Sequence, residues 1–105
     1  MTATLLALYK RPEGGDEALD TFRRRYHNEH MPLIERVPGL RSSVSENVAQ
    51  HYAGEDIVLV TRMIFEDRAA LDAGMASEEM KAAGRNLREI APGLLTLVAL
   101  EEEPA

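Results

Sequence analysis

The chain has 105 residues, of which 45% are hydrophobic and 29% are charged, a balance that favours one small globular domain over residues 1–105 with a single core. Its formal net charge of -6, from 18 acidic and 12 basic side chains, would repel a phosphate backbone, which makes nucleic acid a poor partner. The absence of cysteine excludes disulfides, thiolate catalysis and cysteine-ligated zinc.

No apolar run approaches the roughly 20 residues that a membrane-spanning helix needs. The N-terminus also lacks the basic region followed by a hydrophobic segment that marks a secretory signal. We therefore expect a cytoplasmic protein that makes no use of a membrane.

The chain begins with a predicted strand and a predicted helix. Residues 3–10 are apolar at both alternating positions, as expected for a strand covered on both faces. Residues 11–15 then form a turn, because Pro12 removes a backbone donor and paired glycines favour turns, and Asp16 stands where a helix N-cap would. Side chains recurring every three or four residues predict the buried stripe of a helix: Leu19, Phe22, Tyr26, His30, Leu33 and Val37.

Pro32 limits this first helix. Its ring would clash with the carbonyl group of residue 28, so we expect the regular helix to end or bend near Met31. His30 then lies in the last turn before the break and on the buried stripe, whereas His27 and Glu29 point to either side of it.

Two predicted strands follow. After a stop signal at residues 37–39, residues 40–48 alternate between two sets of side chains, one of them wholly polar, which predicts an edge strand with one wet face. Residues 57–65 form the most β-branched run and are predicted to be the central strand. Arg62 is the only charge in that run, so it needs a partner or access to water.

The remaining elements complete a recognisable order. Asp67 and Ser77 are predicted N-caps of a two-part helix that ends near Ile90, and residues 94–100 form the last predicted strand. The order strand, helix, strand, strand, helix, strand predicts a ferredoxin-like α+β fold, βαββαβ, with a four-stranded antiparallel sheet. Since the helices cover one face and three strands are apolar on both, we expect a homodimer packed through the open sheet face.

Three segments near the N-terminus carry a family resemblance: residues 9–12 (YKRP), 26–33 (YHNEHMPL) and 37–40 (VPGL). In these segments the chain resembles the EthD-like family of the dimeric α/β-barrel superfamily, and in length and strand order the resemblance covers the whole chain. It implies a dimer whose sheets close into an α/β barrel, with a small pocket in each subunit between the sheet and its own helices. It also matches His30 to a histidine that such families hold before Pro-Leu.

His30 and Tyr9 are the candidate catalytic residues. Imidazole exchanges protons near neutral pH, so His30 would act as a general acid or base; the simpler alternative is a packed histidine whose nitrogens are satisfied. Tyr9 could donate a hydrogen bond to a carbonyl oxygen that gains charge, or it could be a strand-end aromatic with its hydroxyl in water.

Tyr26 and Arg62 are the candidate substrate-binding residues. Tyr26 shares the buried stripe with His30, and it either lines the pocket or fills the core. Arg62 either holds a substrate carboxylate or pairs with Glu46 on the neighbouring strand.

Other kinds of site are disfavoured. His27 and His30 are spaced so that they could share a metal ion, with Glu29 and His51 as further ligands, but this is not a His-Glu-x-x-His motif and we predict no metal site. Residues 13–16 (EGGD) do not match a phosphate-binding glycine loop, and no serine stands in a Gly-x-Ser-x-Gly elbow.

The expected function is binding of an apolar or aromatic, carbonyl-bearing metabolite between the sheet and the helices. With His30 as acid or base, the protein would be an isomerase, cyclase or degradative enzyme that needs no cofactor. The superfamily resemblance leaves two alternatives open: a non-catalytic small-molecule binding module, and a heme- or metal-handling or monooxygenase relative of the same barrel.

Overall fold

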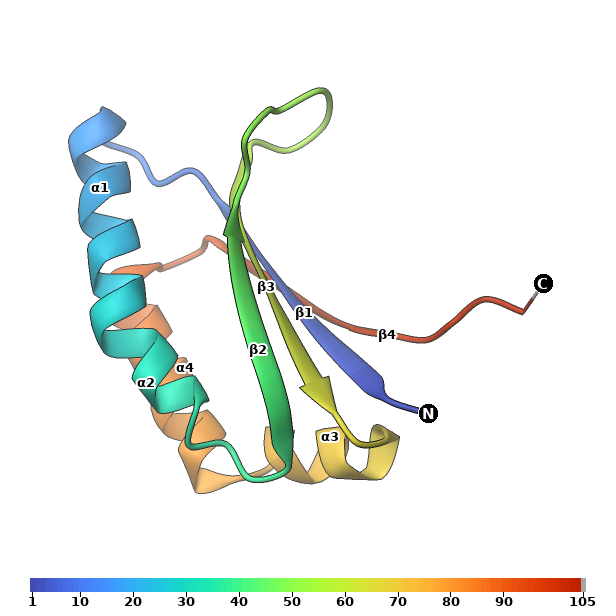
Figure 1. The fold of residues 1–105 in the computed structure, drawn as a ribbon. Helices are drawn as coiled ribbons and strands as arrows, with labels where there is room; N and C mark the ends of the chain where they lie inside the picture. The colour runs from blue at the N-terminus through green and yellow to red at the C-terminus, as the bar shows by residue number, and fades with distance from the viewer. Residues whose placement is uncertain (105) are drawn as a thin grey trace.

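One antiparallel sheet of four strands forms the centre of the structure, with the helices on one of its faces (Figure 1). The structure is a computed structural model that describes residues 1–104, so the last residue of the predicted domain lies outside the described part. The strand order is β2-β3-β1-β4, which confirms the ferredoxin-like α+β fold. The strands are β1 (Ala3–Lys10), β2 (Leu40–Asn47), β3 (Ile57–Phe65) and β4 (Leu95–Leu100).

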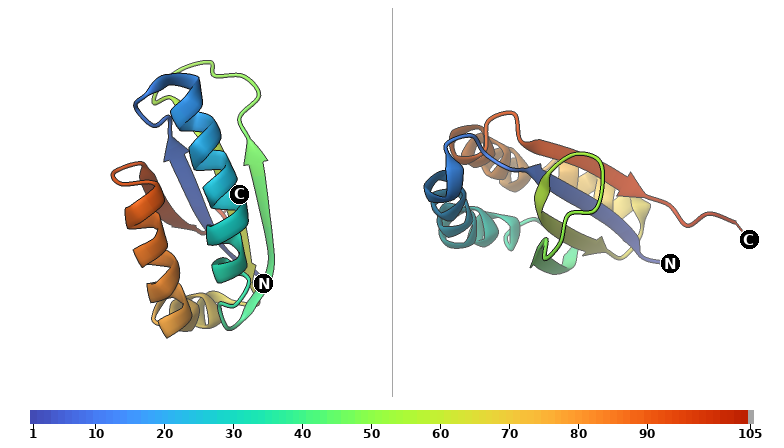
Figure 2. Two further views of the ribbon diagram at one scale, coloured as in Figure 1. Left: turned by 90° about the vertical axis from the view of Figure 1, so that its left-hand side faces the viewer. Right: turned by 90° about the horizontal axis from the view of Figure 1, so that it is seen from above.

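The helical layer has two long parts that lie over the sheet and one short helix at its end (Figure 2). The first part consists of α1 (Gly15–Arg25), the π-helical turn η1 (Tyr26–His30) and α2 (Met31–Ile34). The second is α4 (Glu78–Ile90), and the short helix at the end of the sheet is α3 (Arg68–Met75). None of the helices in residues 1–104 is both long and apolar enough to cross a membrane.

Two of the three predicted helix caps are confirmed. The Asp67 carboxylate accepts a hydrogen bond from the backbone N–H of Ala70 at 2.8 Å, and the Ser77 hydroxyl accepts one from that of Met80 at 3.1 Å. The prediction for Asp16 is wrong, because α1 begins one residue earlier, and Asp16 lies within its first turn. The cap is Gly14, whose φ of 111° is a left-handed conformation that favours glycine.

The two faces of β1 differ in their cover. Alternate residues from Ala3 to Tyr9 are buried beneath the helices, and the residues between them are half-buried on the open face. Phe65 at the end of β3 has no exposed surface and packs in the same core. Apolar side chains on both faces of one strand are what the sequence pattern predicted.

The edge strand β2 departs from its predicted orientation. A register shift between Leu40 and Ser42 changes which side chains face the helices, as a bulge does in an antiparallel pair. The polar residues after the shift, Ser43, Ser45 and Asn47, therefore pair with inward-facing residues of β3. The Ser45 hydroxyl bonds that of Thr61 at 2.8 Å. Val44 lies on the open face instead and is 53% exposed.

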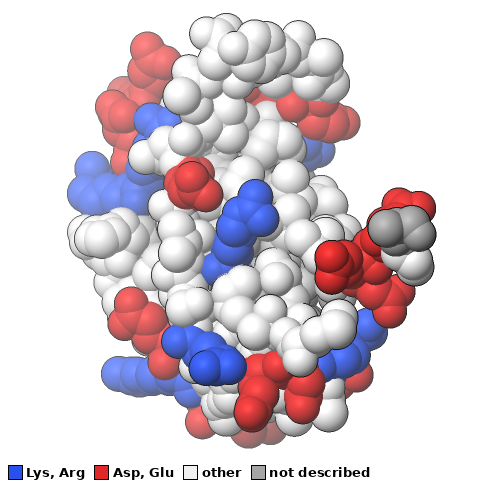
Figure 3. Space-filling view, turned by 45° about the vertical axis from the view of Figure 1, so that its right-hand side comes forward, with Lys and Arg blue, Asp and Glu red and all other residues white. Residues whose placement is uncertain are grey.

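The open face of the sheet is largely apolar. Leu6, Val60 and Ile64 are only half-buried there, and Val98 is 39% exposed. Figure 3 shows this side as mostly uncharged surface with most charged side chains around its margin. The face therefore has the composition of a surface that associates with a partner.

Candidate functional site

A cavity of about 240 Å³ lies between the sheet and α4. Its walls are almost entirely apolar, from alternate residues of β1 and β4 and from one side of α4. Its polar lining residues are Tyr9, His30 and Lys81. The cavity lies between the sheet and a helix, where the family resemblance implied a pocket, and the two candidate catalytic residues are both in its lining.

His30 is one of the residues that line this cavity, and only 2% of its surface is exposed. Its Nδ1 lies 3.2 Å from Oδ1 of Asn86 on α4, and Nε2 forms no hydrogen bond with any group in residues 1–104. Burial lowers the pKa of His30 to about 4, and the bond to Asn86 opposes this shift. The imidazole is therefore neutral at pH 7.

The π-helical turn explains how His30 reaches the cavity. The N–H of Met31 bonds the carbonyl oxygen of Tyr26, five residues back. In a regular α-helix, residue 32 would donate its N–H to the carbonyl oxygen of residue 28, but Pro32 has no N–H. That hydrogen bond is missing in either geometry, so the wider π-helical turn does not lose it. The regular helix ends at Arg25, earlier than the predicted position near Met31, where α2 begins instead. The ring centroids of Tyr26 and His30 lie 5.0 Å apart.

Tyr9 is buried rather than exposed to water. Only 1% of its surface is accessible, and its ring meets that of Tyr26 edge to face with centroids 5.1 Å apart. Burial, together with the neighbouring Tyr26, raises the pKa of its hydroxyl above the ordinary value. Tyr9 is therefore a neutral phenol among the residues that line the cavity.

The structure does not bring Tyr26 and Arg62 to the cavity. Tyr26 lies in the core, and its hydroxyl hydrogen-bonds that of Thr61. Arg62 lies on the opposite face of the sheet, in register with Leu6, and its Nε is 3.9 Å from the carboxylate of Glu46. For both residues the structure has the simpler of the two arrangements considered from the sequence.

Asn86 is the polar neighbour of His30 that sequence analysis missed. Its Nδ2 also donates to Oε1 of Glu29 at 3.2 Å, and Glu29 accepts from Nε of Arg25 at 2.7 Å. Arg25 holds the pKa of the Glu29 carboxyl below its usual value. The sequence did contain one indication of this role: Asn86 is a polar amide that lies between Ala83 and Leu87, two residues on the apolar side of the last helix.

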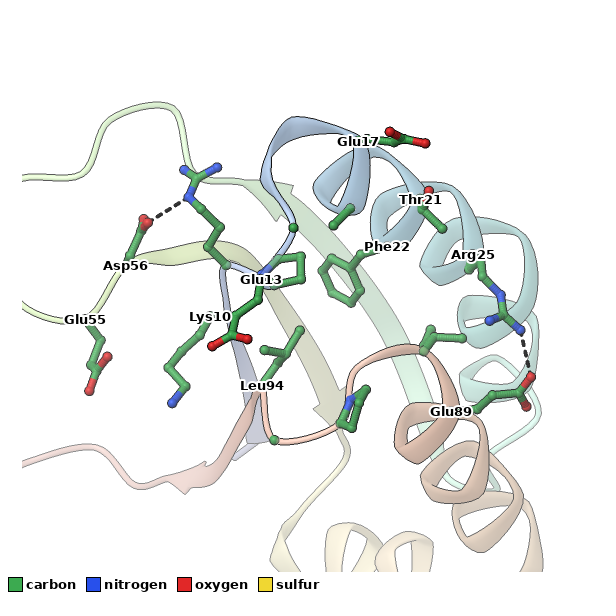
Figure 4. Close-up of a pocket in the computed structure, with 17 residues that line it drawn as sticks. Lys10, Glu13, Glu17, Thr21, Phe22, Arg25, Glu55, Asp56, Glu89 and Leu94 are labelled. Atoms are coloured by element: carbon green, nitrogen blue, oxygen red, sulfur yellow. Dashed lines mark hydrogen bonds and ion pairs between the residues drawn. The ribbon is translucent and has the colours of Figure 1, made fainter.

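A wider groove of about 1200 Å³ lies where the start of α1, the end of α4 and residues 55–56 meet (Figure 4). Its charged side chains are partly paired with one another: Arg11 with Asp56 at 2.7 Å, and Arg25 with Glu89 at 2.9 Å. The surface there has mixed charge and holds no buried titratable group. The smaller cavity beside His30 is therefore the better candidate for chemistry.

The other histidines lie apart from this cavity. His27 is exposed on η1, and the ring of His51 bonds the carbonyl oxygen of Gly54 at 2.9 Å in an exposed turn. Across residues 1–104, no three His, Asp or Glu side chains are grouped so that they could hold a metal ion.

Gly84 forms part of the cavity wall and offers a test of its free space. A Cβ at Gly84 would meet no atom within 4 Å, so Gly84→Ala is expected to raise the free energy of unfolding by about 0.5–1 kcal/mol through helix propensity. Gly74→Ala is the contrasting variant, since its Cβ would lie 3.2 Å from Val37 and from the carbonyl oxygen of Pro38. Urea unfolding should show a higher free energy of unfolding for Gly84→Ala and a lower one for Gly74→Ala. A lower value for Gly84→Ala would contradict the free space beside Gly84.

Comparisons with known proteins agree with this architecture. The sequence pattern of the EthD domain matches residues 16–86. A Bacillus halodurans protein, described as an ethyl tert-butyl ether D (EthD) family protein, is 34% identical, with 98% of this chain and 100% of that chain covered and a TM-score of 0.85. No functionally curated protein has a matching sequence.

More distant structures share the fold alone. A dimeric ferredoxin-like protein of unknown function from Jannaschia is 23% identical, with 97% of this chain and 100% of that chain covered and a TM-score of 0.70. SnoaB, a cofactor-independent oxygenase from Streptomyces nogalater, is 13% identical, with coverages of 99% and 95% and a TM-score of 0.60.

Proposed function

The chain belongs to the EthD family, and on that premise we propose that it binds an apolar or aromatic, carbonyl-bearing metabolite in the cavity beside His30. One observation carries the proposal: a buried neutral imidazole and a buried neutral phenol line the same apolar cavity. Apolar walls with a few convergent polar groups are typical of small-molecule sites.

The proposed chemistry is a proton transfer next to a carbonyl group. The neutral imidazole of His30 would accept a proton from the carbon or oxygen beside the carbonyl. The Tyr9 hydroxyl would donate a hydrogen bond to the carbonyl oxygen as that oxygen gains negative charge. This step suits an isomerase, a cyclase or a degradative enzyme that needs no cofactor.

A second candidate is binding without catalysis. It is favoured by the pKa of about 4 for His30, because a general base works best when its pKa lies near the working pH. Such a protein would use the same cavity and the same two hydrogen-bonding groups without turning the ligand over.

We also propose that the protein is a homodimer formed through the open sheet face. Ferredoxin-like relatives of similar size are dimeric, and Leu6, Ile64 and Val98 give the open face the apolar composition that a partner would cover.

The test begins with small aromatic and carbonyl compounds screened by thermal shift, since a specific ligand raises the stability of the folded state. For a compound that is turned over, His30→Gln is expected to lower kcat about a hundredfold, the usual contribution of one general base, while binding is largely retained. His27→Gln is the matched control at an exposed position and should keep full activity. Unchanged turnover in folded His30→Gln would remove the catalytic role, and binding without turnover would support the second candidate.

A further inference from the structure

We infer that Asn86 fixes the tautomer of His30, so that an unprotonated Nε2 serves the cavity and selects ligands that present a hydroxyl group, as a phenol or an enol does. The inference rests on the proposed function for its ligand. Its tautomer part concerns the protein alone and can be tested without any ligand.

The first step is the direction of the hydrogen bonds behind His30. Arg25 has only donors, and it binds both oxygens of Glu29, with Nε at 2.7 Å and Nη2 at 3.1 Å. The ionised Glu29 carboxylate has only acceptors, so the group of Asn86 that faces it at 3.2 Å must be the Nδ2 amine. The amide oxygen of Asn86 is thereby turned toward His30.

The second step is the proton on the imidazole. The amide oxygen of Asn86 can only accept, and it lies 3.2 Å from Nδ1 of His30, so Nδ1 must carry the hydrogen. The opposite tautomer would set two acceptors against each other at that distance. Flipping the Asn86 amide would instead set its oxygen against the Glu29 carboxylate, so both alternatives are disfavoured.

The groups around His30 support a single tautomer. The ring of Tyr26 lies 5.0 Å from that of His30 on the helix, and Tyr9 on the sheet lines the same cavity. Lys81 lines the same cavity, but its side chain is exposed and its Nζ is 3.2 Å from Glu78. Glu29 acts on the ring through Asn86 rather than by direct contact. Because His30 is neutral at pH 7, the nitrogen opposite Nδ1 carries a lone pair.

The consequence concerns the ligand. A hydrocarbon in the cavity would leave the Nε2 lone pair without a donor, and a carbonyl oxygen placed there would face it with another acceptor. A hydroxyl group satisfies it, while the Tyr9 hydroxyl can donate to a carbonyl oxygen of the same ligand. The best match is an aromatic or enolic compound with a hydroxyl group next to its carbonyl.

The tautomer can be measured by ¹⁵N NMR of the imidazole in the full chain at pH 7. Nδ1–H is expected for His30 in the wild type, and Asn86→Ala should shift the nitrogen signals toward a mixture of tautomers. Asn28→Ala, which removes an exposed amide from η1, should leave them unchanged. Nε2–H in the wild type would overturn the inference, as would an unchanged tautomer in Asn86→Ala.

Ligand selection can be measured with p-cresol and p-xylene, which differ by a hydroxyl in place of a methyl group, and with 4-methylbenzaldehyde as a probe that only accepts. Since water solvates these probes differently, the useful quantity is the ratio of their Kd values in each variant. The preference for p-cresol over 4-methylbenzaldehyde is expected to fall about fivefold in Asn86→Ala, because the hydroxyl can bond either tautomer whereas the aldehyde oxygen gains one hydrogen bond from the second, and to persist in Asn28→Ala. 4-Methylbenzaldehyde should gain on p-xylene in Asn86→Ala, because the second tautomer offers it a donor.

The outcomes separate the two proposals. If none of the probes perturbs the NMR signals of Leu5, Ala7 or Leu97 in the cavity wall, the proposed binding function fails, whatever the tautomer. If the probes bind there with the same Kd ratios in wild type and Asn86→Ala, the cavity binds small molecules and the inference about hydroxyl selection is wrong.

Discussion

Lowering the pH from 7 to 4 is expected to reduce the free energy of unfolding by about 3 kcal/mol through His30 alone. The pKa of this side chain falls from 6.5 to about 4 because the ring is buried. Between these values the unfolded chain binds a proton that the folded chain does not, so stability rises with pH. The contribution of the neutral His30 to the free energy of unfolding is complete above pH 6.5 and is lost as the pH falls toward 4.

Urea unfolding at several pH values between 7 and 4 measures this effect. His30→Gln should show a flatter dependence on pH than the wild type, because glutamine does not titrate. His27→Gln should keep the wild-type dependence, because His30 is still present. The carboxylates of Glu29 and Asp56, whose pKa values are lowered by Arg25 and Arg11, also lose stabilising contacts in acid, but they do so in all three proteins. Equal slopes in wild type and His30→Gln would contradict the buried neutral histidine.

Replacing Leu6 with Glu is expected to convert the proposed homodimer into a monomer of 11.7 kDa. Leu6 lies on the open face beside Arg62 in β3, so in a monomer the new carboxylate has a basic neighbour and access to water. In a dimer packed through this face, the same carboxylate would be buried in each subunit, which costs several kcal/mol per charge.

Sedimentation equilibrium at micromolar concentration gives the mass directly. Thr21→Glu places the same charge at an exposed position of α1 that lines the wider groove, away from the open face, and should leave the dimer intact. Circular dichroism of Leu6→Glu should show a folded chain. A monomeric wild type would overturn the dimer proposal, and a dimeric Leu6→Glu would place the interface on another surface.

Local patterns were sufficient to predict the strands and the burial of His30. The first and third strands have the predicted bounds, residues 3–10 and 57–65, because runs of apolar and β-branched residues are encoded within each segment. His30 is buried as predicted from its recurrence four residues after Tyr26, and the π-helical turn keeps both side chains on the same side of the helix.

The rest depended on contacts between distant segments. The bond between His30 and Asn86 spans 56 residues, and no local pattern pairs those two side chains. Both faces of β3 are apolar, so the alternation alone could not show on which face Arg62 lies. The register shift after Leu40 likewise reverses the faces of β2 without any change in its pattern of polar residues.

Because of the π-helical turn, the cavity beside His30 depends on the number of residues in this turn more than on the identity of each of them. A turn closed by a bond over five residues contains one residue more than an α-helical turn, so everything after it is rotated by about 100° from the position it would have in an unbroken helix. His27 and Asn28 are exposed within this turn, and many side chains should be accepted at both positions. Deleting either residue would restore a regular helix, and it would turn either His30 and Ile34 or Phe22 and Leu19 away from the core.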